Sequence, residues 1–202
     1  MLPEKLQLKI FATATSSVEA EAFIPVFHRW IKEHVLPELL VDVANYAHVP
    51  EGPGVGIIGH GADYFMDSAE GRLGLVHVRK RAGTDGDRLA DLARRTLHVA
   101  SLLEREPSLE GKLRFETNEL LFRVNDRLVA PNTDLTFTAL GPELRAFAES
   151  IYGGPCELTR VGSAKELFSV RVTQATKVAL PALLERAGGP PGPDASIVPT
   201  AP

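Results

Sequence analysis

Residues 6–14 read LQLKIFATA, and this stretch decides how the chain begins to fold. Apolar side chains recur at every second position, at Leu6, Leu8 and Ile10, with Gln7 and Lys9 between them. A period of two is typical of a β-strand that buries one face. We therefore expect a strand over residues 6–14 with its apolar face on a core.

A helix and a second strand are expected next. Ser16-x-x-Glu19 offers a capping box, and apolar side chains at helical spacing from Ala20 to Ile31 predict a helix that follows it and runs to His34. Pro25 lies inside this pattern, so either the helix is kinked there or its first turn begins near Phe23, because proline has no N–H to donate inside a helix. The apolar, β-branched run at 39–44 predicts the second strand, so the chain should start as a β-α-β unit.

The rest of the chain predicts a β-hairpin three times, each followed by a helical pattern. The pair Gly141-Pro142 should divide the second of these helices, with the proline at the first position of the new piece. The expected hairpins are 55–60 with 73–79, 113–117 with 120–124 and 156–161 with 166–173, and the helical patterns run from Leu89 to Ala100, from Phe137 to Ile151 and from Leu180 to Ala187.

These elements place the chain in the α+β class. The β-α-β start could give one parallel crossover, whereas hairpins give antiparallel pairs, so we expect a mixed, mainly antiparallel sheet. Each helix has one apolar stripe, which can be buried only against another apolar surface, so the helices should pack on one face of the sheet. A chain of 202 residues can bury a core of its own, and we expect a single domain over residues 1–187.

The segment after this domain has a different composition. Residues 188–202 read GGPPGPDASIVPTAP, which includes five prolines and three glycines. Such a segment has too few apolar side chains to build a core. We expect an extended tail that is either flexible or lies on a partner protein.

Composition excludes several classes of protein. The chain is 44% hydrophobic and 24% charged, which is typical of soluble globular proteins. Its net charge of −4 gives no broad attraction to nucleic acid, and no apolar run approaches the ~20 residues that cross a bilayer. Cys156 is the single cysteine, and the N-terminal residues lack the layout of a signal peptide. We expect a cytoplasmic protein with no membrane span and no nucleic-acid partner.

The glycines at positions 54, 56 and 59 match the dinucleotide-binding pattern G-x-G-x-x-G. Their context does not fit, because β-branched residues between them predict a strand and no helix pattern follows. We therefore expect these glycines to serve close packing in a sheet or a bulge. Walker A, H-E-x-x-H, G-x-S-x-G and paired-cysteine motifs are absent from the sequence, which weakens the case for an enzyme.

The sharpest chemical hypothesis is a metal or polar-ligand site made by His48, His60, Asp63, Tyr64 and His77. If positions 60 and 77 lie close across the sheet, two imidazoles and a carboxylate could converge on a divalent cation. The alternative is that the histidines occupy strand ends, where backbone or water satisfies them, while the aspartate caps a turn. These residues do not identify a cofactor, so the metal stays unknown.

Five stretches carry a resemblance: EAFIPVFHRWI at 21–31, DVANYAHVPEGPGV at 42–55, GHGADY at 59–64, GRLGLVHVRKR at 71–81 and VNDRLVAPNT at 124–133. Together they resemble a family of uncharacterised bacterial proteins of similar length. The resemblance covers most of residues 6–175 and excludes the tail. It implies a bacterial, cytoplasmic source and brings no activity, cofactor or catalytic residue with it.

Two kinds of function follow from these patterns. The first is a non-enzymatic subunit or adaptor that docks on a partner protein through a sheet edge, a helix face or the tail. The second is a metal- or small-ligand-binding enzyme centred on the five residues of the predicted site. The missing catalytic motifs and the extended tail favour the first.

Overall fold

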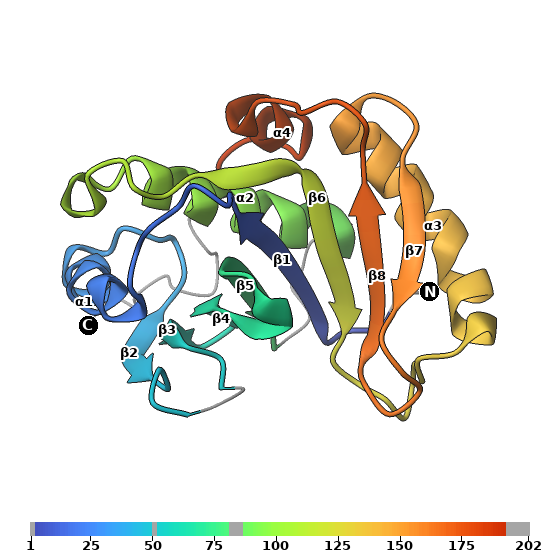
Figure 1. Cartoon of the computed structure of the whole chain (residues 1–202), viewed down its shortest axis with the longest axis horizontal. Helices are drawn as coiled ribbons and strands as arrows, with labels where there is room; N and C mark the ends of the chain where they lie inside the picture. Colours follow the sequence, from blue (N-terminus) through green and yellow to red (C-terminus); the bar gives the residue numbers. More distant parts are fainter. Residues whose placement is uncertain (1–2, 50–51, 81–86, 193–202) are drawn as a thin grey trace, which may run out of the picture.

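A computed structural model describes residues 3–49, 52–80 and 87–192 of the chain. The strands are β1 (Leu6–Ala12), β2 (Leu40–Asn45), β3 (Val55–Gly59), β4 (Ala62–Asp67), β5 (Gly74–Arg79), β6 (Phe115–Val124), β7 (Glu157–Val161) and β8 (Phe168–Thr173). They form one sheet in the order β2-β3-β4-β5-β1-β6-β8-β7, as Figure 1 shows. Each neighbouring pair in this order is antiparallel, so the predicted α+β class and mainly antiparallel sheet are confirmed.

The helices cover one face of this sheet. α1 contacts β2 and β3, α2 contacts β5 and β1, and α3 contacts β8 and β7, while α4 packs on α2 and α3. In Figure 1, α2 and α3 lie behind the strands, and the opposite face of the sheet is turned toward the viewer. The α-helices are α1 (Phe23–Glu33), α2 (Arg88–Glu104), α3 (Asp134–Tyr152) and α4 (Leu180–Arg186), with short 3-10 turns η1 (Ala20–Ala22), η2 (Ala69–Gly71) and η3 (Pro107–Leu109).

The first residues of α1 and α2 explain why each helix begins where it does. α1 starts at Phe23, so Pro25 lies in its first turn, where no N–H is needed, and the second of the two predicted alternatives is confirmed. The side chain of Asp87 caps α2 by accepting hydrogen bonds from the first-turn amides of Leu89 and Ala90. None of the helices in the described residues is both long enough and apolar enough to span a membrane.

β1 is buried on both of its faces. Leu6, Leu8 and Ile10 point toward α2 and are at most 3% exposed, as the period of two predicts. Lys9 and Phe11 point to the other face, which carries no helix, yet both are also buried. The turn η2 folds over Lys9, and Arg72, which follows the turn, lies over Phe11. A short segment therefore covers the centre of the open face, where no helix lies.

A strand lies where a loop was expected. β4 pairs with β3 on one side and with β5 on the other, so the predicted hairpin of residues 55–60 with 73–79 is wrong. His60 and Gly61 form the turn into β4, and Ala62, Tyr64 and Met66 alternate into the core. The three strands therefore form a meander, which adds one more strand to this side of the sheet.

The expected parallel pair of the first two strands does not form. β3, β4 and β5 lie between β2 and β1, and four successive antiparallel pairings make β1 and β2 point the same way without contact. The chain crosses to the far edge through α1 and then returns strand by strand. The apolar pattern of a strand predicts its existence but not its neighbour, which explains the error.

Two predicted interruptions are also wrong. Residues 113–117 and 120–124 do not form a hairpin, because the polar segment between them continues as one strand, β6, with a shift in its pairing to β1. The pair Gly141-Pro142 does not divide α3, which runs unbroken for 19 residues. Leu140 and Leu144 are buried on either side of the proline, so packing holds the two halves in line.

The third predicted hairpin, β7 with β8, and the helix α4 are confirmed.

The glycines of the G-x-G-x-x-G pattern lie in and beside β3. A Cβ on Gly56 would overlap the ring of Phe65 and lie 2.5 Å from the carbonyl oxygen of Tyr64. A Cβ on Gly59 would lie 2.5 Å from the carbonyl oxygen of Ala62. The interpretation that these glycines allow close packing in the sheet is therefore confirmed.

We expect Gly56→Ala to lower the free energy of unfolding by about 2 kcal/mol, because the added methyl group requires β3 and β4 to move apart. Chemical denaturation of the variant and the parent chain measures this difference. Gly61→Ala is the matched control, since a Cβ at this position would have no neighbour within 4 Å. Equal losses in both variants would show that backbone freedom, and not the strand contact, sets the requirement for glycine.

Candidate functional site

Tyr64 and His77 are the two predicted site residues that the structure brings together. They lie opposite each other on β4 and β5, with ring centroids 4.6 Å apart and nearly parallel planes. Each is 1% exposed. Both point toward α2, because Leu75 and Met66, two positions away on the same strands, also face the core.

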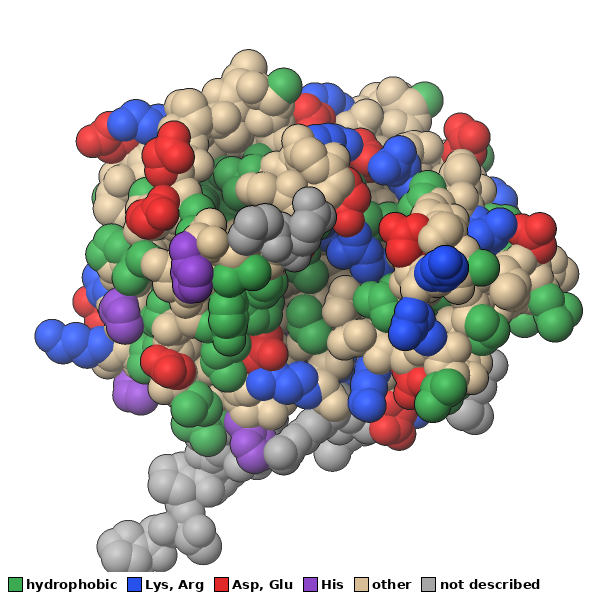
Figure 2. All heavy atoms as spheres, turned by 60° about the horizontal axis from the view of Figure 1, so that its bottom comes forward, with side chains coloured by type: hydrophobic (Ala, Val, Ile, Leu, Met, Phe, Trp, Pro, Cys, Tyr) green, Lys and Arg blue, Asp and Glu red, His purple; other side chains and the backbone are tan. Residues whose placement is uncertain are grey.

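The other three predicted residues lie elsewhere. Asp63 faces the opposite side of the sheet from Tyr64, and its carboxylate pairs with Lys80 at 2.7 Å. His60 is exposed in the turn before β4, and His48 is exposed in the loop after β2. In the described ranges no three His, Cys, Asp or Glu side chains are grouped so that they could hold a metal ion. Figure 2 likewise shows histidine side chains set apart from one another on this side of the molecule.

Charged side chains surround the Tyr64–His77 pair. The Tyr64 hydroxyl donates to Oε1 of Glu38, and Arg95 donates to the same oxygen at 2.9 Å. Arg95 also donates through Nε to Asp91 at 2.9 Å. A continuous chain of hydrogen bonds, Tyr64–Glu38–Arg95–Asp91, therefore links β4, the segment before β2 and the first half of α2. We call these four residues and His77 the α2 polar cluster.

Burial sets the protonation state of His77. It lowers the pKa of the imidazole to about 3, and Arg95 contributes in the same direction, so the ring is neutral at pH 7. Nδ1 lies 3.2 Å from the carbonyl oxygen of Leu92, which can only accept, so this nitrogen carries the proton. Nε2 has no hydrogen-bond partner among the described residues.

Burial and neighbouring charges also shift the pKa values of Tyr64 and Asp91. Burial raises the pKa of Tyr64 well above its ordinary value, and the nearby Glu38 carboxylate adds to this effect, so the hydroxyl keeps its proton and donates. Burial acts to raise the pKa of Asp91, but pairing with Arg95 outweighs it, and the net shift is downward. Asp91 is therefore ionised and Tyr64 neutral at pH 7.

The sequence contained a partial signal for this cluster. Asp91, Arg94 and Arg95 recur at i, i+3 and i+4 on α2, a spacing that places opposite charges side by side. Glu38 carries no such signal, because its partners lie 26 and 57 positions away in the chain. At 7% exposure or less, Glu38, Tyr64 and His77 are closed off from solvent. The α2 polar cluster therefore links α2 to the sheet through buried hydrogen bonds.

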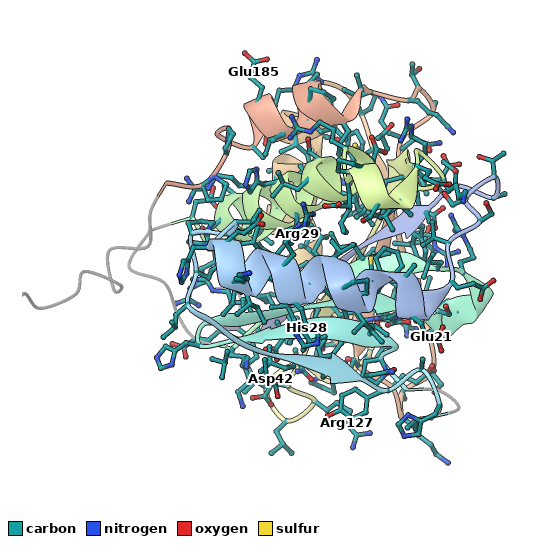
Figure 3. All side chains as sticks on the ribbon, turned by 90° about the vertical axis from the view of Figure 1, so that its left-hand side faces the viewer. Glu21, His28, Arg29, Asp42, Arg127 and Glu185 are labelled. Carbon is teal, nitrogen blue, oxygen red and sulfur yellow. The ribbon has the colours of Figure 1, made fainter. Side chains whose placement is uncertain are left out.

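Exposed apolar side chains gather at β2 instead. In the part of the chain that the structure describes, four of the seven exposed large hydrophobic residues lie on β2 or beside it: Leu39, Val41, Tyr46 and Val49. β2 is the last strand of the sheet and has β3 as its one strand neighbour. The pairing with β3 shifts between Leu40 and Asp42, so Val41 is the extra residue of a bulge and is 63% exposed. In Figure 3, Asp42 marks this strand at the sheet edge below α1.

The opposite edge, β7, is protected by polar side chains. Asn132 donates to the carbonyl oxygen of Val161 at 2.9 Å, and Arg145 donates to that of Cys156 at 2.7 Å. Arg160, on β7 itself, pairs with Asp134 at 2.8 Å. Charged side chains and occupied main-chain groups are common devices that keep edge strands from pairing with other chains. The β2 edge has fewer of these devices: Asp42 is its one charged residue and accepts from the N–H of Val43, and Val41 forms the bulge.

We expect the free energy of unfolding to fall with acidification from pH 7 to pH 5. The pKa of His77 is near 3 in the folded chain and about 6.5 when unfolded, so the unfolded state takes up the proton first. The expected slope below pH 6.5 approaches about 1.4 kcal/mol per pH unit for this one group. Urea denaturation at several pH values measures the slope, which should decrease in His77→Leu. An unchanged slope in that variant would contradict the assignment.

Comparison of the chain with protein-family models, with curated proteins and with solved structures found no match.

Proposed function

We propose that the protein is a non-enzymatic docking subunit that binds a partner protein along the free edge of β2. The observation that carries the proposal is the concentration of exposed apolar side chains on an edge strand and its flanks. An edge strand offers main-chain N–H and C=O groups that an extended segment of another protein can pair with. The partner therefore supplies an additional strand.

The side chains at this edge favour an apolar partner segment. Leu39 and Val41 are 50% and 63% exposed. Burying the exposed surface of each side chain against a partner contributes roughly 1 kcal/mol to the free energy of binding. Asp42 accepts a hydrogen bond from the N–H of Val43, so its charge is directed at its own strand. A segment with aliphatic side chains at alternate positions matches this surface better than a charged one.

α1 keeps β2 in place before any partner arrives. Its buried face, which includes Phe27 and Trp30, contacts β2 and β3. Glu106 also holds the helix, since it pairs with Arg29 and accepts from Nε1 of Trp30 at 3.3 Å. Figure 3 shows Arg29 and His28 on opposite sides of α1, with Arg29 toward α2. A strand held in this way loses little conformational entropy when it binds, which favours affinity.

Docking through the C-terminal tail stays a separate prediction. Residues 193–202, which make up most of the predicted tail, lie outside the described residues. The proposal for β2 does not depend on them.

We expect Val41→Lys to abolish native co-purification of the partner, because a lysine on an edge strand opposes the addition of another strand. Thr159→Lys on β7 is the matched control, since it places the same charge at an exposed position of the opposite edge. Mass spectrometry of proteins recovered with each variant and with the parent chain measures the effect. Recovery of the same partners with both variants would refute docking at β2.

A further inference from the structure

A cavity of about 470 Å³ opens on the face of the sheet that the helices leave uncovered. Leu121 of β6 and Ser169 and Arg171 of β8 line it from the strands. Glu70 in the turn η2 borders it on one side, and the β7–β8 loop at 162–167 borders it on the other. This volume lies within the range of sites that bind small organic molecules.

The lining of the cavity is positively charged. Four basic residues (Arg123, Arg127, Lys165 and Arg171) and two acidic ones (Glu70 and Glu166) contribute to it. Both carboxylates are already engaged by the protein. Glu70 accepts hydrogen bonds from Arg123 and, at 2.8 Å, from Lys9, while Glu166 accepts from the N–H of Ser163. The acidic groups are thus satisfied, and a positive charge is left over for a ligand.

Donors on three basic residues remain available. The ammonium of Lys165 has no ion-pair or hydrogen-bond partner within the described ranges. Nε of Arg171 lies 3.2 Å from Glu119, close enough for attraction but not aligned for a hydrogen bond, and its terminal nitrogens are unengaged among the same residues. Arg127 donates one bond to the carbonyl oxygen of Lys165, which holds its guanidinium beside the loop. Figure 2 shows Lys and Arg side chains interspersed with Asp and Glu on the right of the molecule.

Apolar side chains complete the lining. Leu121 is buried in the sheet, and Val161 and Leu167 are half-buried at the ends of the β7–β8 hairpin. Val161 and Leu167 keep part of their surface exposed and offer it to an apolar part of a ligand, as in most small-molecule sites. We propose that this cavity binds a small organic anion, whose phosphate or carboxylate lies among Arg127, Lys165 and Arg171 and whose apolar part lies on Val161 and Leu167. The proposal is independent of docking at β2, because it concerns a different part of the sheet.

Titration of the full-length chain with hexyl phosphate, hexanoate, hexanol and inorganic phosphate, followed by NMR, tests this site. We expect one of the two organic anions to bind with a dissociation constant of about 1 mM or tighter and to shift amide signals of β6, β8 and the β7–β8 loop. Hexanol and inorganic phosphate should each bind at least about tenfold more weakly, since each lacks one of the two parts. The tighter of the two organic anions identifies the head group.

Lys165→Gln and Arg171→Gln should each weaken binding of the organic anion about fivefold or more, because each removes one charged donor. Lys112→Gln is the control, since Lys112 is an exposed lysine paired with Glu110 and does not line the cavity. Three results would overturn the proposal: no saturable binding of either organic anion up to about 10 mM, hexanol or inorganic phosphate binding as tightly as the organic anions, or binding that both glutamine variants leave unchanged.

Discussion

The fold depends on burying both faces of β1 when helices cover only one of them. α2 covers the face that carries Leu8. On the other face, Lys9 is wholly buried, and its ammonium donates to the carbonyl oxygen of Ala69 at 2.9 Å and to Glu70 at 2.8 Å, with Asp67 at 3.3 Å. A buried ammonium without such partners would cost several kcal/mol, so η2 has to close over the strand. Glu70 takes up left-handed backbone geometry, with φ of 60°, to do so.

This closure also shapes the rest of the open face. Glu70 accepts from Lys9 on one side and from Arg123 on the other, so the turn that buries β1 also forms one border of the cationic cavity. Arg72, at the end of the turn, lies 4.1 Å over the ring of Phe11 and donates two hydrogen bonds to Glu119 of β6. The two proposed binding surfaces therefore lie on either side of this buried centre: the cavity over β6, β8 and β7, and the docking edge at β2.

Local patterns predicted local structure well and long-range contacts poorly. The strand β1, the helix α1 and the last hairpin depend on spacing within a few residues, and all three could be predicted, with two alternatives for the first turn of α1. The sequence patterns do not predict β4, because they do not identify His60-Gly61 as a turn, and they divide β6, because the polar centre of that strand resembles one. Of the predicted site, Tyr64 and His77 do meet, but Glu38 and Arg95 could not be added, since tertiary contacts alone bring them together.

Docking at β2 is the central claim, and amide hydrogen exchange tests it most directly. Exchange would be followed in the free chain and in the complex recovered with its native partner, at residues 40–45 of β2 and 157–161 of β7. An added strand protects the outward-facing amides of its neighbour, so the account predicts slower exchange at β2 in the complex and unchanged exchange at β7. Unchanged exchange at β2, with new protection elsewhere on the chain, would contradict it.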